Sequence, residues 1–276
     1  SKLLKDLEDV LEVQLFDRLP RGMRPTRYGE TMIRHARIAL GSLNQAHDEL
    51  MALKAGSFGQ VNVGAITSPG LTLLPPAVAM VKREQPNLRV SLEIDTSPVL
   101  LERLEQGKLD ILVARLFAEH DKTQVRYIAL IEEPVCAVVR PGHPMLGMSG
   151  LALADMVDAG WIVPPTGSVL RHRFELMFQQ EGLAPPVDTV ETSALLFITH
   201  MLQQSDMVAV LAADVAHYYA AHGLVVVLPL AMPCHMDAFG IITRTDRLQS
   251  PAAKVMMRAL KMASLSVYGR ELEMGD

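Results

Sequence analysis

The sequence has few cysteines: Cys136 and Cys234 are the only two among 276 residues. Two isolated cysteines give neither a disulfide framework nor the spacing of a metal site. No apolar run reaches the roughly 18 residues that a membrane span needs, and no charged-then-apolar signal segment opens the chain. These absences favour a globular cytoplasmic protein without a membrane partner, and the 49% of apolar residues is enough for a sizeable core.

The chain also lacks an ordered set of catalytic or metal-binding side chains. Cys136 and His143 are close in sequence, and Cys234 directly precedes a histidine, but no third residue is placed to order either pair as nucleophile and base. His217 and His222 are five positions apart, whereas two metal ligands on one helix face would be four apart. We therefore predict that the protein is not an enzyme and has no metal or cofactor.

The net charge of −5 does not indicate a protein that binds nucleic acid, but the distribution of charge does. Residues 18–37 contain six arginines and one acidic residue, Glu30, in a chain that is otherwise mildly acidic. A basic cluster of this kind is typical of a phosphate-binding surface. On charge alone, a solvated basic face is an equally good interpretation.

The first 54 residues predict a small head followed by a long helix. Residues 1–12 have apolar positions at helical spacing, residues 13–18 form an apolar extended segment, and residues 20–25 carry turn residues and arginines. A helix, a strand, a basic turn and a returning strand are the elements of the wing of a winged helix. Thr26 is a candidate N-cap for a helix that continues to Lys54.

One face of that long helix has heptad spacing, which gives a narrow apolar seam suited to pairing with a second helix. The alternative is a helix packed on the core of its own domain. We favour dimerisation, because the opposite face is polar. The seam comprises Ile33, Ala36, Leu40, Leu43, His47 and Leu50.

Beyond a hinge-like linker at residues 55–59, short strands alternate with helices, which predicts an α/β fold with a mostly parallel sheet. We expect strands at 60–66, 88–94, 109–114, 135–139, 161–163, 208–211, 224–228 and 239–243. We expect helices at 71–85, 97–106, 169–180, 193–204, 214–221 and 250–265.

Several segments, in this order and spacing, resemble the LysR-type family of transcriptional regulators over nearly the whole chain. The matching segments are Leu15-Phe16-Asp17-Arg18, residues 20–29 with Thr26 and Gly29, residues 60–64, Leu73-Leu74-Pro75, residues 106–110 and residues 140–144. The departure from the family is at the front, where the first helix and most of the helix-turn-helix are absent from the sequence, so we expect residue 1 to lie within that motif.

The resemblance implies three parts. Residues 1–27 would be a partial winged-helix DNA-binding domain, residues 28–56 a linker and dimerisation helix, and residues 59–276 an effector-binding domain that resembles a periplasmic binding protein. Within the last, lobe I would take about 59–136 and 241–276, and lobe II about 137–240. A stand-alone solute-binding protein of the same lobe architecture is the alternative.

Seven of the predicted effector-binding residues follow strands at the points where helices begin, and Arg115 follows the strand at 109–114, where its guanidinium could pair with an acid group. Free backbone N–H groups there attract an anion, and hydroxyls add donors. The alternative for Thr67 and Ser68 is helix capping, and the alternative for Arg115 is a structural salt bridge. Between two lobes, these groups would suit a small organic anion. The candidates are Thr67, Ser68, Arg115, Thr166, Gly167, Ser168, Thr192 and Ser193.

The predicted partners are promoter DNA, the small anion and further copies of the chain, as a homodimer or, as is usual in the family, a homotetramer. RNA polymerase is a further candidate partner. We expect Arg21 and Arg24 at the tip of the wing, Arg18 and Arg27 at its shoulders, and Lys2 and Lys5 on the remnant of the recognition helix to contact DNA.

Overall fold

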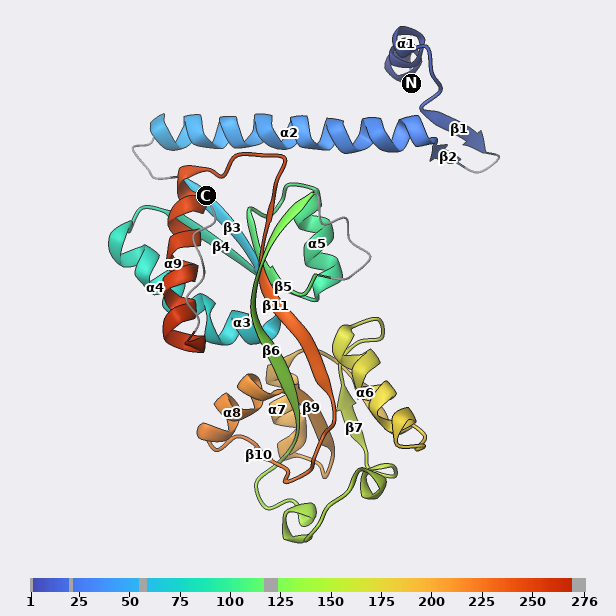
Figure 1. Ribbon diagram of the computed structural model, residues 1–276, viewed down its shortest axis with the longest axis vertical. Coiled ribbons are helices and arrows are strands. Elements are labelled where there is room, and N and C mark those ends of the chain that lie inside the picture. The colour runs from blue at the N-terminus through green and yellow to red at the C-terminus, as the bar shows by residue number, and fades with distance from the viewer. Residues whose placement is uncertain (1, 20–21, 55–58, 117–123, 270–276) are drawn as a thin grey trace.

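The computed structural model describes residues 2–19, 22–54, 59–116 and 124–269. A small N-terminal head, a long helix and a large α/β unit follow one another along the chain (Figure 1). Arg21 and most of the predicted linker lie outside the described residues. No helix within these ranges has both the length and the apolar character of a membrane span.

The head consists of α1 (Lys2–Leu11), β1 (Phe16–Leu19) and β2 (Gly22–Pro25). The two strands pair antiparallel, as the wing pattern predicts. Oε1 of Glu8 in α1 accepts hydrogen bonds from the backbone N–H groups of Leu15 (2.7 Å) and Phe16 (3.1 Å). These two bonds hold the helix against the hairpin.

The long helix α2 runs from Arg27 to Lys54, which confirms the helix predicted after Thr26. The N–H of Gly29 donates to Oγ1 of Thr26 (3.1 Å), and the N–H of Thr26 donates to the carbonyl of Leu15 (2.9 Å). A Cβ atom at Gly29 would lie only 1.9 Å from that carbonyl oxygen. The start of α2 and the head therefore approach so closely that glycine is required.

In the described part of the α/β unit, nine strands form one sheet in the order β4-β3-β5-β11-β6-β9-β7-β8, with β10 paired to β6. Strands β6 and β11 are antiparallel and run through the whole unit, which they divide into two lobes (Figure 1). The strands are β3 (Gln60–Ala65), β4 (Arg89–Ile94), β5 (Ile111–Ala114), β6 (Val125–Val139), β7 (Trp161–Val163), β8 (Thr189–Glu191), β9 (Val208–Ala212), β10 (Val226–Val227) and β11 (His235–Arg244).

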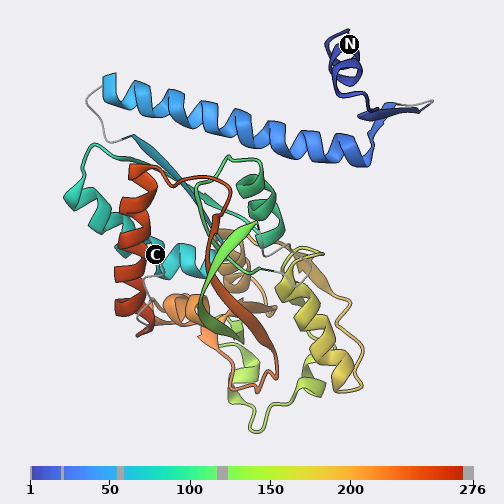
Figure 2. The same ribbon diagram turned by 45° about the horizontal axis from the view of Figure 1, so that its top comes forward.

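Lobe I contains the parallel strands β3, β4 and β5, and Figure 2 shows α2 lying across it. Every residue of β5 is buried, which explains why this strand is a continuous apolar run. Met256 and Leu260 of α9 are fully buried in the same core. The helices of this lobe are α3 (Thr67–Thr72), α4 (Leu74–Glu84), α5 (Ser97–Glu105) and α9 (Pro251–Tyr268).

Lobe II contains the parallel strands β7, β8 and β9. Trp161 is fully buried, with its ring 4.8 Å from that of Phe174 and 6.2 Å from that of Phe178, both edge-on. Its Nε1–H donates to the carbonyl of Met156 (3.0 Å), so the polar edge of the indole has a partner. The helices of this lobe are α6 (Val169–Gln180), α7 (Leu195–Gln203) and α8 (Ala213–Ala221), with short 3-10 turns at Pro144–Gly147 and Leu153–Met156.

The prediction of one helix at 71–85 is wrong, because the structure has two helices here and the first begins before residue 71. Helix α3 starts at Thr67, and Leu73 separates it from α4. Pro75 and Pro76 have no N–H to donate to the preceding turn, so they can start a helix but not continue one. The strand predicted at 135–139 is also longer, since β6 begins at residue 125.

Candidate functional site

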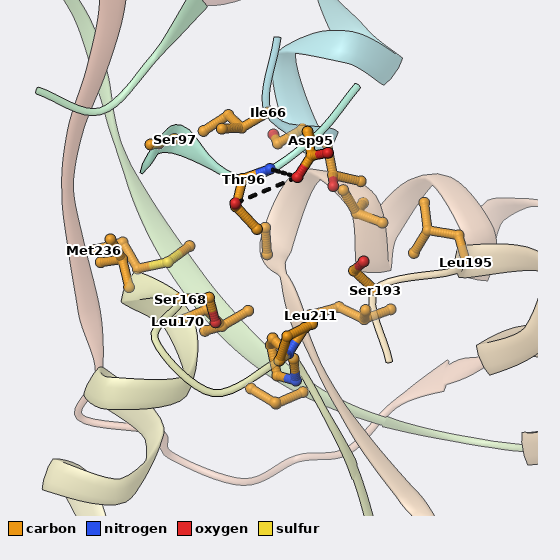
Figure 3. A pocket seen from close by; sticks show the side chains of 18 of the residues that line it. Ile66, Asp95, Thr96, Ser97, Ser168, Leu170, Ser193, Leu195, Leu211 and Met236 are labelled. Atoms are coloured by element: carbon orange, nitrogen blue, oxygen red, sulfur yellow. Dashed lines mark hydrogen bonds between the residues drawn. The ribbon is translucent and has the colours of Figure 1, made fainter. Parts of the chain in front are cut away.

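The cavity between the two lobes has a volume of about 200 Å³. It lies at the carboxyl ends of β3, β4 and β7, where the chain turns into helices, and ligands of open α/β sheets bind at such ends. Figure 3 shows Asp95, Thr96 and Ile66 on one side, and Ser168, Ser193 and Leu211 on the other. The volume is below the roughly 300–1,000 Å³ of a drug-sized pocket, so the cavity fits a small ligand.

Six of the eight predicted effector-binding residues line this cavity, three from each lobe. Thr166 and Gly167 do not belong to the lining. Gly167 has a φ of +86° in the turn before α6, and Thr166 is engaged elsewhere. The lining residues among the candidates are Thr67, Ser68, Arg115, Ser168, Thr192 and Ser193.

Ser68 is not the N-cap that its position after a strand allows. It is the second residue of α3, whose N-cap is Ile66. Its side chain is buried, with the residue 2% exposed, and its Oγ has no hydrogen-bond partner among the described residues. A buried hydroxyl without a partner is costly, and Ser68 is one of the residues that line the cavity.

Ser168 does act as a cap. Its Oγ accepts from the N–H of Arg171 (3.3 Å) at the start of α6. Oγ1 of Thr192 accepts in the same way from the N–H of Ala194 (3.1 Å). Both hydroxyls therefore have a local structural partner and keep their own O–H for a further acceptor.

Arg115 is 7% exposed and forms the salt bridge that the sequence left open. Its Nη2 is paired with Oε2 of Glu133, and its Nε donates to the carbonyl of Asp237 (3.0 Å). Its backbone N–H donates to Oγ of Ser97 (3.2 Å). The guanidinium thus ties β5 to both crossing strands, and a contact with a ligand stays a prediction.

Thr166 is bound to the neighbouring strand. Its N–H and its Oγ1–H donate to the two carboxylate oxygens of Glu191, both at 3.0 Å. These hydrogen bonds, with Arg171 nearby, hold the pKa of Glu191 below its ordinary value. The turn before α6 is therefore attached to β8.

The segment Asp95–Pro98 lines the cavity but was missed by the sequence analysis. Asp95 accepts from the N–H of Thr96 (2.6 Å) and lies near its hydroxyl (3.3 Å) (Figure 3). Ser97 is buried and holds Arg115. A signal was available, because Thr96-Ser97-Pro98 repeats the triplet Thr67-Ser68-Pro69 after the next strand.

The predicted DNA contacts are exposed wherever the structure describes them, on α1, the hairpin and the start of α2. Exposed cations are what phosphate contacts need. Arg21 lies outside the described residues. The exposed cations are Lys2, Lys5, Arg18, Arg24 and Arg27.

Five of the six seam positions of α2 are exposed in the single chain, and Ile33 is half-buried. Leu43, for example, is 66% exposed. Free apolar side chains along a helix are what pairing with a second helix requires, so dimerisation through the seam stays a prediction. The exposed positions are Ala36, Leu40, Leu43, His47 and Leu50.

In the described parts of the chain, no three histidine, cysteine or acidic side chains gather into a group that could hold a metal ion. Burial raises the pKa of both thiols, Cys136 and Cys234, which disfavours the reactive thiolate.

Comparison with known proteins identifies the family. Residues 54–264 match the family described as "LysR substrate binding domain". The transcriptional regulator GbpR of Azospirillum brasilense is 38% identical over 275 residues, which cover 99% of this chain and 80% of GbpR. PcaQ of Agrobacterium fabrum is 30% identical over 274 residues, covering 99% and 88%.

Solved structures agree in fold. A full-length OxyR variant from Pseudomonas aeruginosa has a TM-score of 0.64 at 24% identity, covering 99% of this chain and 87% of that one. The effector binding domain of QuiR in complex with shikimate has a TM-score of 0.62 at 18% identity, covering 78% and 99%. The family model and the two relatives confirm the resemblance found in the sequence: this chain belongs to the LysR-type family of transcriptional regulators, and is not a stand-alone solute-binding protein.

Proposed function

We propose that this regulator binds a small molecule in the cavity between its lobes and DNA through the exposed cations of its head. The proposal of a small-molecule site rests on Ser68, which has a buried hydroxyl without a partner and belongs to a cavity lining rich in hydroxyls. We divide the chain as the resemblance implies, into a head at 1–27, a linker helix at 28–56 and an effector-binding domain at 59–276.

Ligand binding would control DNA binding through the angle between the lobes. Only β6 and β11 among the described strands run through both lobes, so the lobes can turn about them. A ligand with different affinities for two lobe angles shifts the population between them. In an oligomer, that shift would change the spacing of the DNA-binding heads. A ligand that leaves both the oligomer shape and the DNA footprint unchanged would contradict this coupling.

The DNA-binding half is tested by the salt dependence of affinity for a labelled duplex. Each phosphate contact that is lost should reduce the slope of log K against log salt by about one. We expect this change for Arg24→Ala, because Arg24 is exposed on β2 of the head. Arg103→Ala is the matched control, since Arg103 lies on α5 in a surface pair with Glu93. Equal slopes for both variants would refute the proposal that the cations of the head contact DNA phosphates.

The seam of α2 would join two copies of the chain. Leu43→Glu places a charge among the exposed apolar positions of the seam, and Leu196→Glu is the matched control at an 84% exposed leucine on α7 of lobe II. Analytical ultracentrifugation should give a smaller assembly for Leu43→Glu only. An unchanged assembly would leave α2 as a helix that packs on its own chain.

The relatives named above are transcriptional regulators, which supports a regulator without catalytic activity that acts on DNA in the cytoplasm. Contact with RNA polymerase belongs to the same proposal.

A further inference from the structure

Glu133 lines the cavity and has one buried carboxylate oxygen without a partner. The residue lies in the middle of β6, is 3% exposed, and lines the cavity between the lobes. Its Oε2 is paired with Arg115, but Oε1 is buried and accepts no hydrogen bond in the described structure. Buried polar atoms normally have a partner, so Oε1 indicates a hydrogen-bond donor that comes from a ligand.

The ion pair of Arg115 and Glu133 beside this oxygen disfavours a charged ligand group of either sign. The charged residues in the lining are Asp95, Arg115 and Glu133. The positive charge of Arg115 is already compensated by Glu133 at contact distance. A ligand carboxylate near Arg115 would also lie near Oε1 of Glu133, where like charges repel, and a ligand ammonium near Glu133 would lie near the guanidinium.

The uncharged lining is rich in hydroxyls, which both donate and accept hydrogen bonds. Ser68 supplies a second buried atom without a partner. A ligand with several hydroxyls complements such a wall, because each ligand hydroxyl can donate to one protein atom and accept from another. The lining hydroxyls belong to Thr67, Ser68, Thr96, Ser97, Ser168, Thr192 and Ser193.

We propose that the cavity takes a small, neutral polyhydroxylated ligand of the sugar or cyclitol class, and that Glu133 determines this specificity. One ligand hydroxyl donates to Oε1 of Glu133, which completes the hydrogen bonding of the carboxylate. This inference rests on the proposed function, and it replaces the organic anion that the sequence predicted with an uncharged molecule.

The test compares ligands that share one ring and differ in charge. The full chain is titrated with D-glucose, D-glucuronate and D-glucosamine, with D-galactose, D-galacturonate and D-galactosamine, and with myo-inositol, while the melting temperature is recorded. A ligand that binds the folded state raises the melting temperature. We expect at least one neutral member to bind about tenfold or more tightly than its matched acid and amine, because misplaced charges weaken a complex strongly.

Glu133→Gln keeps an acceptor oxygen but removes the charge, so the preference for the neutral member over its acid should largely disappear. Glu93→Gln is the matched control, because Glu93 is also paired with an arginine of lobe I but lies outside the cavity lining. It should keep the preference. The comparison of neutral and charged ligands on the unaltered chain stands even if Glu133→Gln folds poorly.

Two outcomes overturn the inference: tighter binding of an acid or amine than of its neutral partner, or no shift with any neutral member. If an acid binds more tightly and this binding is lost in the Ser68→Ala variant, the proposed function is still supported, since the ligand then binds in the cavity. The DNA test with Arg24→Ala is independent of any ligand, so its failure would refute the proposed function separately.

Discussion

Replacing glycine by alanine should have opposite effects on stability at two positions of α2. Alanine is favoured over glycine in a helix interior by about 1 kcal/mol. At Gly41 a new Cβ would meet only Nη1 of Arg247, at 3.8 Å, which is an ordinary contact. Gly41→Ala should therefore stabilise α2 by up to about 1 kcal/mol.

At Gly29 the new Cβ would lie 1.9 Å from the carbonyl oxygen of Leu15 and 3.2 Å from Cβ of Pro25. A backbone carbonyl cannot rotate away as a flexible side chain can, so the head must move and the hydrogen bond from the N–H of Thr26 to Leu15 is weakened. Overpacking of this kind costs about 1–3 kcal/mol. Gly29→Ala should therefore destabilise the junction of head and helix.

Amide hydrogen exchange read by mass spectrometry measures both effects locally. Because exchange follows the free energy of local opening, a loss of about 1–3 kcal/mol accelerates it roughly 5- to 150-fold. We expect that acceleration in peptides covering residues 13–31 of Gly29→Ala, and slower exchange in peptides covering residues 35–50 of Gly41→Ala. If both variants slow exchange, helix propensity alone determines the effect of the two substitutions, and the close approach of the head to α2 is refuted.

Three further predictions concern the large unit. Arg115→Met leaves the carboxylate of Glu133 buried and unpaired, which should lower the free energy of unfolding in urea by about 3–5 kcal/mol. Adding Glu133→Leu should recover most of that loss. A double variant whose loss equals the sum of the losses in the two single variants would contradict this. Ser168→Ala removes the cap of α6 and should cost about 0.5–2 kcal/mol in the same assay. The hydrogen bond from Arg244 holds the pKa of Asp246 below its ordinary 3.8, so this carboxylate stabilises the fold above pH 3.8 and the benefit is lost as pH falls through the lower folded pKa. The stability difference from Asp246→Asn should accordingly shrink in acid, and a constant difference would contradict it.

The elements that the sequence predicts well are those whose causes are local. The buried run of β5 and the heptad spacing of α2 are periodic patterns, and both elements are present. The break between α3 and α4 at Leu73 also has a local cause, because two prolines follow it. The prediction of a single helix did not take these prolines into account. The need for glycine at position 29 is different, since it arises from the carbonyl of Leu15, which is brought there only by the folded head.

In the site, the rule that ligands bind where parallel strands end identified six lining residues, five of them at strand-to-helix junctions and Arg115 directly after β5. The same rule applied to the end of β4 predicts Asp95–Pro98, so that omission was avoidable. The rule failed for Thr166, because a hydroxyl at such a junction can equally bind a neighbouring strand, and here Glu191 is opposite. Which of the two occurs depends on the pairing of β7 with β8, and the two segments are far apart in sequence.

Glu133 could not have been found in this way. A glutamate inside a strand reads as a solvated position, and its burial follows from the sheet order, in which β5 and β6 lie on either side of β11. Arg115 follows β5 and reaches Glu133 on β6, while its Nε binds the carbonyl of Asp237 on β11. One guanidinium therefore connects both strands that join the lobes, and its partner forms part of the cavity wall. A ligand hydroxyl that binds Oε1 of Glu133 acts directly on the residues about which the lobes would turn, so in this chain the group that selects the ligand also belongs to the hinge that would transmit its binding.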